Sequence, residues 1–176
     1  MPFDIIAGMH VTNRAIGFAG KIPWKCRTDM KFFKEITTRT RDATKVNAVI
    51  MGRKTFESLH APLPNRVNVV LSKGSNNLDD TIAELESDSN IETIFVIGGE
   101  MVYREAINHP KCDKIYLNTV HCDLSGADAF FPEIDPNMYE LVQTTVMDAT
   151  VTSYLYKRII FINELSLNNY LLEKLQ

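Results

Sequence analysis

Three short apolar segments of this chain each run into a glycine or a hydroxyl residue, and this repeated pattern constrains the fold most. The segments are residues 46–51, 67–71 and 94–97, and they are followed by Gly52, Ser72 and Gly98. Their length and their β-branched content are typical of buried strands. Because such strands alternate with helical segments, the sequence predicts an α/β domain with a central, mainly parallel sheet flanked by helices.

Two alternating segments near the end of the chain, residues 139–145 and 151–161, predict an antiparallel hairpin at the edge of this sheet, with its turn near Asp148. One domain over residues 1–161 accounts for the whole pattern. The tail, residues 162–176, has leucines at helical spacing. We expect a terminal helix docked on the domain, a frayed end, or the start of a linker to a second domain.

The strand ends are the expected ligand side, because ligands of open α/β sheets bind at the carboxyl ends of the strands. At the first of them, Gly52 is followed by Arg53, Lys54 and Thr55. A helix start offers unpaired backbone N–H groups to an anion, and these side chains add charge and a hydroxyl. The segment therefore predicts a pyrophosphate site, and the alternative is a solvated basic helix start.

A second glycine-containing strand end supports the same interpretation. Gly98 and Gly99 follow an apolar strand and precede a helical segment. Two glycines allow a ligand to approach the backbone closely. At a third strand end, Ser72 and Lys73 supply a hydroxyl and a cation, which suit a phosphate group.

One carboxylate lies on the apolar face of a predicted helix. Between residues 27 and 37, Met30, Phe33 and Ile36 recur at helical spacing, and Asp29 lies four residues before Phe33. A buried carboxylate should have a raised pKa, because desolvation disfavours its charged form. Asp29 is therefore a candidate proton donor or a partner for a cationic ligand. The alternative is an acid in the first turn of the helix that faces water.

Composition argues against several other classes of protein. A net charge of −3 gives no general affinity for nucleic acid or for a membrane surface. Three cysteines without metal-ligand spacing argue against a zinc site or a disulfide framework and indicate a reducing, cytoplasmic location. No basic flank precedes an early apolar run, and no apolar run is long enough to span a bilayer, so we expect neither a signal peptide nor a membrane segment.

These motifs resemble those of the dihydrofolate reductase family, and the resemblance covers residues 3–161 with every motif in order. The family has an Ile-Gly, a short glycine-containing loop, a Pro-Trp, and an acid followed by a Phe four residues later. The matching elements are Ile16-Gly17, Gly20, Pro23-Trp24, Asp29 and Phe33. Further matches are Met-Gly-Arg-x-Thr at 51–55, Pro-Leu-Pro-x-Arg at 62–66, Ile-Gly-Gly-x-x-x-Tyr at 97–103 and Phe-Phe-Pro at 130–132.

The resemblance implies NADPH-dependent reduction of 7,8-dihydrofolate to tetrahydrofolate, and binding of antifolates such as methotrexate. It implies that Asp29 orients the pterin and raises its proton affinity, while a water near Trp24 and Ile22 delivers the proton. The implied substrate-binding residues are Ile6, Ala7, Met30, Phe33, Leu59, Leu63, Arg66 and Asn118. The implied cofactor-binding residues are Gly8, Ile16, Gly17, Gly52, Arg53, Lys54, Thr55, Leu71, Ser72, Lys73, Ile97, Gly98, Gly99 and Tyr103. No metal is implied.

Several details of the site follow from the same resemblance. Arg66 would grip the α-carboxylate of the substrate's glutamate tail, and Leu63 would pack on the aminobenzoyl ring; without the resemblance, Arg66 is a surface residue after a turn. Residues 16–24 would form a lid supported by residues 126–132. Members usually have Thr where this chain has Asn118, and the hydroxyl of that Thr bonds the catalytic acid and the pterin amino group. Either Asn118 takes this role or Thr119 is shifted into it.

Two other functions remain open from sequence alone. One is the related NADPH-dependent reductase that acts on a ribosylaminopyrimidine in riboflavin synthesis. The other is a non-catalytic structural or dimerisation domain. We expect a monomer, or a reductase part that is fused to or associated with thymidylate synthase in a longer chain.

Overall fold

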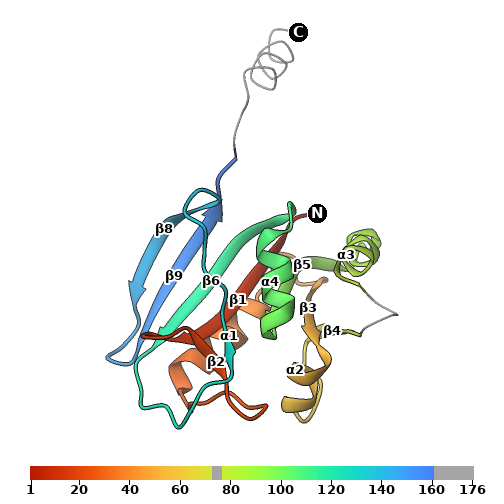
Figure 1. Ribbon diagram of the computed structural model, residues 1–176. Coiled ribbons are helices and arrows are strands. Elements are labelled where there is room, and N and C mark those ends of the chain that lie inside the picture. Colours follow the sequence, from red (N-terminus) through yellow and green to blue (C-terminus); the bar gives the residue numbers. More distant parts are fainter. Residues whose placement is uncertain (73–76, 161–176) are drawn as a thin grey trace, which may run out of the picture.

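A seven-stranded sheet forms the centre of the computed structural model, which describes residues 1–72 and 77–160 (Figure 1). The strands in spatial order are β4 (Arg66–Leu71), β3 (Val46–Gly52), β5 (Ile91–Gly98), β1 (Phe3–His10), β6 (Cys112–Val120), β9 (Val151–Arg158) and β8 (Tyr139–Val146). Neighbours from β4 to β6 pair in parallel, whereas β9 and β8 pair antiparallel. The predicted mainly parallel sheet with an antiparallel C-terminal edge is confirmed.

The last hairpin differs slightly from its prediction. Its turn contains Asp148, as expected, but β9 ends at Arg158 rather than at residue 161. One further bond follows the strand, since the Ile159 N–H donates to the Met138 carbonyl oxygen at 2.8 Å. The predicted alternatives for the tail, residues 162–176, lie outside the described residues.

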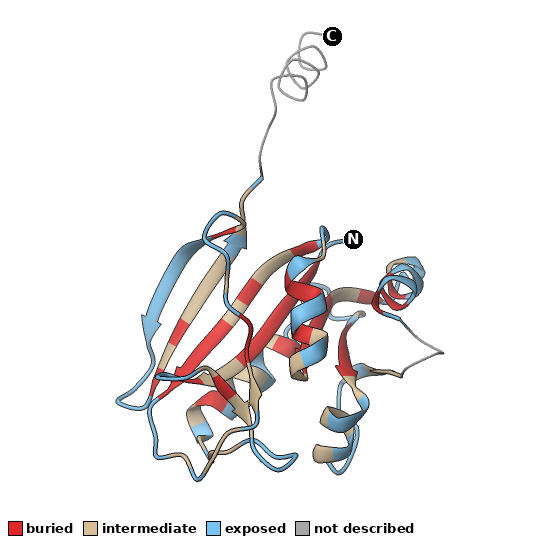
Figure 2. Cartoon of the chain, viewed as in Figure 1, coloured by how far each residue is buried: buried red, intermediate tan, exposed pale blue. Residues whose placement is uncertain are grey.

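Helices cover the two faces of the sheet. On one face, α3 (Leu78–Ser87) and α4 (Glu100–Asn108) bury their apolar sides against β1, β3, β5 and β6. On the other face lie α1 (Arg27–Thr38), the short α2 (Arg53–Ser58) and the loop that follows α2. Successive side chains of a strand point to opposite faces, so Ile5 and Ile6 of β1 enter different clusters. Buried residues therefore concentrate along the central strands (Figure 2).

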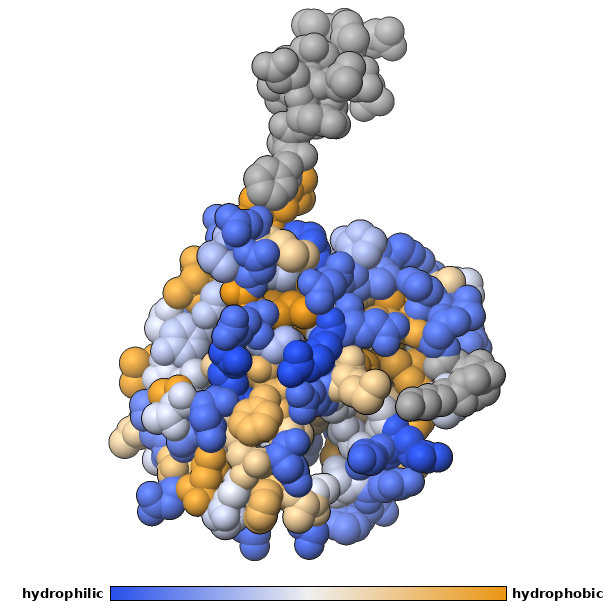
Figure 3. Space-filling view, viewed as in Figure 1, coloured by the Kyte–Doolittle hydropathy of each residue, from blue (hydrophilic) through white to orange (hydrophobic). Residues whose placement is uncertain are grey.

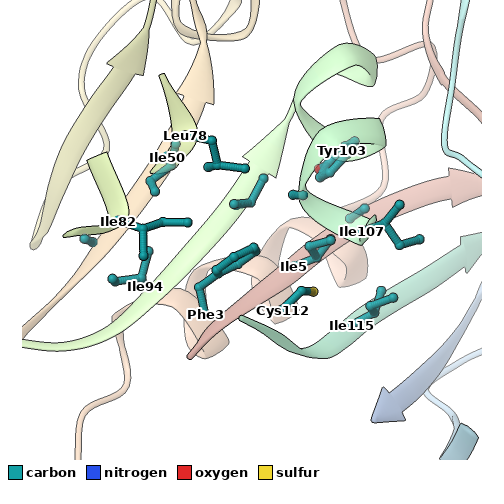
Figure 4. Close-up of a cluster of buried hydrophobic side chains, with 14 of the residues drawn as sticks. Phe3, Ile5, Ile50, Leu78, Ile82, Ile94, Tyr103, Ile107, Cys112 and Ile115 are labelled. Atoms are coloured by element: carbon teal, nitrogen blue, oxygen red, sulfur yellow. The ribbon is translucent and has the colours of Figure 1, made fainter. Parts of the chain in front are cut away.

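The larger core cluster makes this arrangement stable (Figure 4). Ile5, Ile50, Ile94 and Ile115 are fully buried and come from four adjacent or near-adjacent strands. Each buried side chain of this size contributes about 1.5–3 kcal/mol relative to exposure. The sheet is thus a rigid platform, and the loops at the carboxyl ends of its strands can be placed accurately.

A second, two-stranded sheet, β2 (Ala15–Gly17) with β7 (Ala129–Phe130), was not predicted. Each strand is too short to show a period of two in the sequence. This sheet joins the predicted lid to the predicted supporting loop, so it positions one wall of the site. No helix among the described residues has the length and apolar character needed to span a bilayer.

Candidate active site

A cavity of about 1300 Å³ lies at the carboxyl ends of the central strands. Gly8 of β1, Gly52 of β3, Gly98 of β5 and Asn118 of β6 all line it, as expected for an open α/β sheet. Pockets for one drug-sized molecule measure about 300–1000 Å³. The volume is therefore sufficient for two ligands side by side.

Almost all of the residues proposed for the site meet in this one cavity. Those that line it are Ile6, Ala7, Gly8, Ile16, Gly17, Ile22, Trp24, Asp29, Met30, Phe33, Gly52, Arg53, Lys54, Thr55, Leu59, Leu63, Leu71, Ser72, Ile97, Gly98, Gly99, Tyr103 and Asn118. Arg66 does not line it, and Lys73 lies outside the described residues. The geometry brings the residues together, and their individual roles stay predictions.

Asp29 lies at the floor of the cavity and is 7% exposed. The alternative that it faces water is therefore wrong. Trp24 donates from its indole Nε1 to one carboxyl oxygen at 3.3 Å, and Asn118 donates from Nδ2 to the other at 2.9 Å. Burial raises the pKa of Asp29, and the two hydrogen bonds oppose that rise only in part.

A glycine makes this position of the carboxylate possible. Gly8 lies directly beneath Asp29, and a Cβ atom on Gly8 would be 2.7 Å and 2.9 Å from the two carboxyl oxygens. Any side chain on Gly8 would overlap the carboxylate. The carboxyl group thus rests on the backbone of β1.

The structure also separates Asn118 from Thr119. Asn118 points to Asp29, whereas Thr119 donates from Oγ1 to the Thr152 carbonyl oxygen at 3.4 Å. Consecutive strand residues point to opposite faces of a sheet. Of the two alternatives, Asn118 is the one that contacts the carboxylate.

The opposite end of the cavity has the features of a cradle for an anion. Gly98 and Gly99 precede α4, with a cis peptide bond between them. A Cβ atom on Gly99 would lie 3.1 Å from the Thr55 hydroxyl oxygen, so the two strand ends are packed closely. Arg53 and Lys54 add positive charge there, and the one ion pair that Arg53 makes within residues 1–72 and 77–160 is long, at 3.7 Å to exposed Glu57.

Tyr103 connects this end of the cavity to the carboxylate end. Its hydroxyl donates to the Ile6 carbonyl oxygen at 2.9 Å, and its ring packs edge-on against Phe131. Burial raises the pKa of Tyr103, and the nearby charge of Asp29 raises it further. The phenol therefore stays neutral at physiological pH.

Arg66 lies behind the apolar wall of the cavity. Its guanidinium donates to the Thr37 hydroxyl at 2.8 Å and to the Pro64 carbonyl oxygen at 3.0 Å, and its centre is 6.0 Å from the Phe33 ring. Burial lowers its pKa. Among the described residues it makes no ion pair. Arg66 therefore retains charge and donors for a ligand carboxylate beyond Phe33.

The predicted lid contacts its predicted support directly. Asp128 accepts the Ala19 N–H through Oδ2 at 2.8 Å, and its own N–H donates to the Gly17 carbonyl oxygen at 3.0 Å. The Phe18 ring lies so close to Gly126 that a Cβ atom there would be 2.6 Å from it. These contacts join the predicted lid to its support, and residues of both segments line the cavity.

Sequence reasoning missed several residues that line the cavity. The main ones are Phe32, Asn77, Asp80, Glu100 and Met101. Phe32 lies three residues after Asp29, so helical spacing could have identified it. Glu100 links α4 to β7, because its carboxylate accepts the Phe130 N–H at 3.1 Å. The sequence around Glu100 carries no signal for this contact.

No group of three or more His, Cys, Asp or Glu side chains within residues 1–72 and 77–160 is arranged to hold a metal ion. The three cysteines, Cys26, Cys112 and Cys122, are free.

Comparison with known proteins identifies the family. The dihydrofolate reductase family profile matches residues 3–162. Dihydrofolate reductase of Heliothis virescens is 37% identical over 147 residues, which cover 74% of this chain and 79% of that protein. The Drosophila melanogaster enzyme is 36% identical over 160 residues, covering 82% and 87%.

A longer kind of relative is similar over the same region. The bifunctional dihydrofolate reductase-thymidylate synthase of Daucus carota is 40% identical over 147 residues, which cover 73% of this chain and 28% of that protein. This chain thus matches a little over a quarter of the length of the bifunctional relative. The family profile, the identity to full-length reductases and the cavity agree, and the chain belongs to the dihydrofolate reductase family.

Proposed function

We propose that this protein reduces 7,8-dihydrofolate to 5,6,7,8-tetrahydrofolate with NADPH as the reductant. The observation that carries the proposal is a buried carboxylate, Asp29, that shares one cavity with a glycine-rich cradle for an anion. Family membership supports the reaction. The volume of the cavity supports simultaneous binding of cofactor and substrate.

The residues at the cradle end fit a phosphorylated dinucleotide. Gly98 and Gly99 line the cavity without a side chain to cover their backbone, which suits a pyrophosphate, and Arg53, Lys54 and Thr55 supply charge and a hydroxyl. Ser72 lines the same end and suits a 2′-phosphate. When bound, NADPH supplies the hydride, and the protein supplies alignment and exclusion of water.

Asp29 is placed to bind the pterin ring. Each of its oxygens accepts one N–H from the protein, from Trp24 or from Asn118, and keeps acceptor capacity for a ligand. A carboxylate with two free lone pairs pairs well with two parallel N–H groups, such as those of an aminopyrimidine edge. We propose that Asp29 orients this edge and raises the proton affinity of the reacting imine. A water admitted near Trp24 and Ile22 delivers the proton.

The rest of the substrate fits the apolar side of the cavity. Met30 is 53% exposed although it lines the cavity, which is expected of a side chain that a ligand covers. Phe33, Leu59 and Leu63 form the adjoining wall. Arg66 lies next to Phe33 and is proposed to bind the carboxylate of the glutamate tail.

Product analysis tests this proposal. Purified protein is incubated with NADPH or NADH and with either dihydrofolate or a ribosylaminopyrimidine, and the products are separated by chromatography and identified by mass. We expect tetrahydrofolate with NADPH and much less with NADH. If the protein instead reduces a ribosylaminopyrimidine, or binds NADPH without reducing either substrate, the proposal is wrong in favour of the riboflavin-pathway reductase or of a non-catalytic domain.

The bifunctional relatives support the proposal that this chain is fused to, or associates with, thymidylate synthase. Fusion to thymidylate synthase in a longer chain, as in the Daucus carota protein, would place a source of dihydrofolate beside this site. Free cysteines support the proposed cytoplasmic location, because disulfides are rare in reducing compartments.

A further inference from the structure

We infer that Glu100 is a positioning residue that couples the anion cradle to the lid, residues 16–24. The coupling passes through one hydrogen bond, from the backbone N–H of Phe130 in the supporting loop to the Glu100 carboxylate. Filling of the cradle is thereby transmitted to the lid. The inference rests on the proposed function only for the identity of the ligand that fills the cradle.

Glu100 stands at a position where an acid needs an explanation. It is the first residue of α4 and directly follows the two glycines of the cradle. It lines the cavity, and its side chain is 26% exposed. The helix dipole favours negative charge in the first turn, but the same helix start is the proposed seat of a pyrophosphate, which an acid repels. Cofactor binding therefore does not explain the carboxylate.

Both carboxyl oxygens of Glu100 are engaged by the protein. Arg104, one turn later on α4, donates to Oε1 from Nη2 at 2.8 Å and from Nε at 3.2 Å. A glutamate followed by an arginine four residues later is a favourable pair on a helix, and it offsets the negative charge beside the cradle. Oε2 accepts the Phe130 N–H at 3.1 Å. One oxygen thus serves the ion pair, and the other holds the backbone of β7.

The Phe130 N–H lies on the outer edge of β7. The next residue, Phe131, donates its N–H towards β2, to the Arg14 carbonyl oxygen at 2.8 Å. Successive N–H groups of a strand point to opposite sides, so the Phe130 N–H points away from β2. Glu100 is the acceptor that the described residues provide for it. The bond therefore fixes the free edge of the small sheet to α4.

The small sheet carries this restraint to the lid. Phe130 pairs with Ala15, and Ala129 pairs with Gly17 near the start of the lid. A ligand that binds the backbone at the start of α4 fixes the Glu100 carboxylate, and through it β7 and β2. Tyr103 of α4 also packs edge-on against Phe131, and this apolar contact does not involve Glu100. Loss of the hydrogen bond should therefore loosen the lid and leave the core packed.

Trp24 provides a direct readout of the lid. It is the one tryptophan of the chain, and its indole lines the cavity and donates to Asp29. The probe is 2′-phospho-ADP-ribose, which fits the cradle but lacks the nicotinamide ring, so it cannot accept excitation energy from the indole. We expect binding of the probe to change the fluorescence of Trp24 in the wild-type protein.

Three substitutions of Glu100 separate the hydrogen bond from the charge. Glu100→Ala removes both. Glu100→Asp keeps the charge on a side chain one methylene shorter, which does not reach Phe130. Glu100→Gln loses the charge but keeps an acceptor for the Phe130 N–H. We expect the fluorescence change at saturating probe to fall about fivefold in the Ala and Asp variants, the lower end of couplings between sites, and to persist in the Gln variant.

Two further measurements serve as controls. Glu105→Ala removes another acid of α4, one that makes no hydrogen bond or ion pair within residues 1–72 and 77–160, and it should keep the wild-type fluorescence change. The affinity for the probe, measured by calorimetry, should not fall in Glu100→Ala, because a negative charge beside the anion has been removed.

The pattern across the variants decides the question. Equal losses in the Ala and Gln variants would show that the charge, not the hydrogen bond, is responsible. A full fluorescence change in the Ala and Asp variants, or none in the wild-type protein, would show that Glu100 does not couple the two parts. Each of these results overturns the inference.

Hydrogen exchange of the Phe130 amide, followed by NMR without ligand, tests the bond itself. We expect exchange about tenfold faster in the Ala and Asp variants than in the wild-type and Gln proteins, while the core amide of Ile94 stays protected and shows that each variant is folded. Equal exchange of the Phe130 amide in all four proteins would contradict the inference.

Failure of the proposed function gives a different result. If the wild-type protein binds the probe but does not reduce dihydrofolate, the proposed reaction is wrong, and fluorescence and exchange still test the role of Glu100. If the wild-type protein does not bind the probe, both the proposed cofactor site and the coupling are wrong.

Discussion

At the residue scale, the site depends on one carboxylate placed in an apolar setting. Asp29 was predicted from its position on the inward stripe of α1, and the structure buries it. The contacts that hold it come from β1, β6 and the end of the lid. Helical spacing shows which face a residue lies on, but contacts between distant segments depend on strand register. The role of Gly8 beneath the carboxylate was therefore not visible in the sequence.

Asp29→Asn tests the carboxylate directly. An amide cannot become an anion, so it cannot raise the proton affinity of the substrate. We expect kcat/KM to fall by roughly a hundredfold or more at neutral pH, and by less at acid pH, where the substrate is already protonated in solution. Steady-state rates across the pH range check this. A constant ratio of wild-type to variant rate at every pH would contradict it.

A second buried acid, Asp4, is expected to limit stability rather than activity. Asp4 is 6% exposed, and burial raises its pKa from 3.8 to about 6, with Lys114 opposing the rise. Its folded-state pKa lies above its unfolded value, so its contribution to stability is complete below pH 3.8 and is lost as the pH rises through about 6. A rise of this size corresponds to at most about 3 kcal/mol.

Asp4→Asn should therefore stabilise the protein at pH 7 by about 1–3 kcal/mol and have little effect near pH 4. The asparagine oxygen can still accept the backbone N–H of Lys114. Urea unfolding of both proteins at the two pH values measures this. The account of Asp4 is wrong if the gain is the same at both.

At the element scale, the strands that end in glycine were predicted well, whereas the two short strands that join the lid to its support were not. Long apolar runs identify β3 and β5 without tertiary information, because burial on both faces requires such runs. β2 and β7 have two or three residues each, and only their pairing makes them strands. Their position depends on Asp128, whose bonds to Ala19 and Gly17 join segments more than 100 residues apart.

Gly126→Ala should disturb the lid through Phe18. The added methyl group would lie 2.6 Å from the Phe18 ring, which would have to move. We expect turnover to fall about tenfold with little change in the melting temperature, because Phe18 is partly exposed and belongs to the lid rather than to the core. Stopped-flow and steady-state rates give the effect.

The control for this variant is Phe18→Ala, alone and combined with Gly126→Ala. Once the ring is absent, the methyl group has nothing to displace. The substitution at Gly126 should then cost little more than Phe18→Ala alone. An equal tenfold loss in the Phe18→Ala background would show that Gly126 acts by another route.

At the scale of the whole molecule, the parallel sheet brings the ends of separate strands to one edge and so assembles the cavity. That grouping was predictable, because parallel strands share their carboxyl ends. The position of Arg66 was less predictable. Arg66 lies behind Phe33 because its guanidinium donates to the Thr37 hydroxyl and to the Pro64 carbonyl oxygen. The position of Arg66 thus depends on a contact between α1 and β4, and the sequence of neither segment alone reveals that contact.

The outer edge of the sheet is the part of the surface least explained by the site. Leu141, Val142 and Val146 of β8 are exposed, and apolar side chains gather where β8 forms the left edge of the molecule in Figures 1 and 3. They lie far along the sheet from the cavity, with β9 between β8 and β6. Substitution of these residues should leave the kinetics unchanged.

Cofactor binding should stabilise the whole molecule. The cradle draws on the ends of β3, β4 and β5, so a bound dinucleotide holds these strands together. At a hundredfold excess over its dissociation constant, a ligand stabilises the folded state by about 2.7 kcal/mol. NADPH should raise the melting temperature by several degrees and NADH by much less. Equal shifts for the two would contradict the proposed 2′-phosphate contacts.

The most direct test of the account is the oxidation of NADPH by purified protein in the presence of dihydrofolate, with and without methotrexate. The account predicts turnover that methotrexate abolishes and that Asp29→Asn severely reduces at neutral pH. Absence of turnover in wild-type protein that still binds NADPH would contradict it, since the cradle would then be intact and the carboxylate end would not perform the proposed reduction.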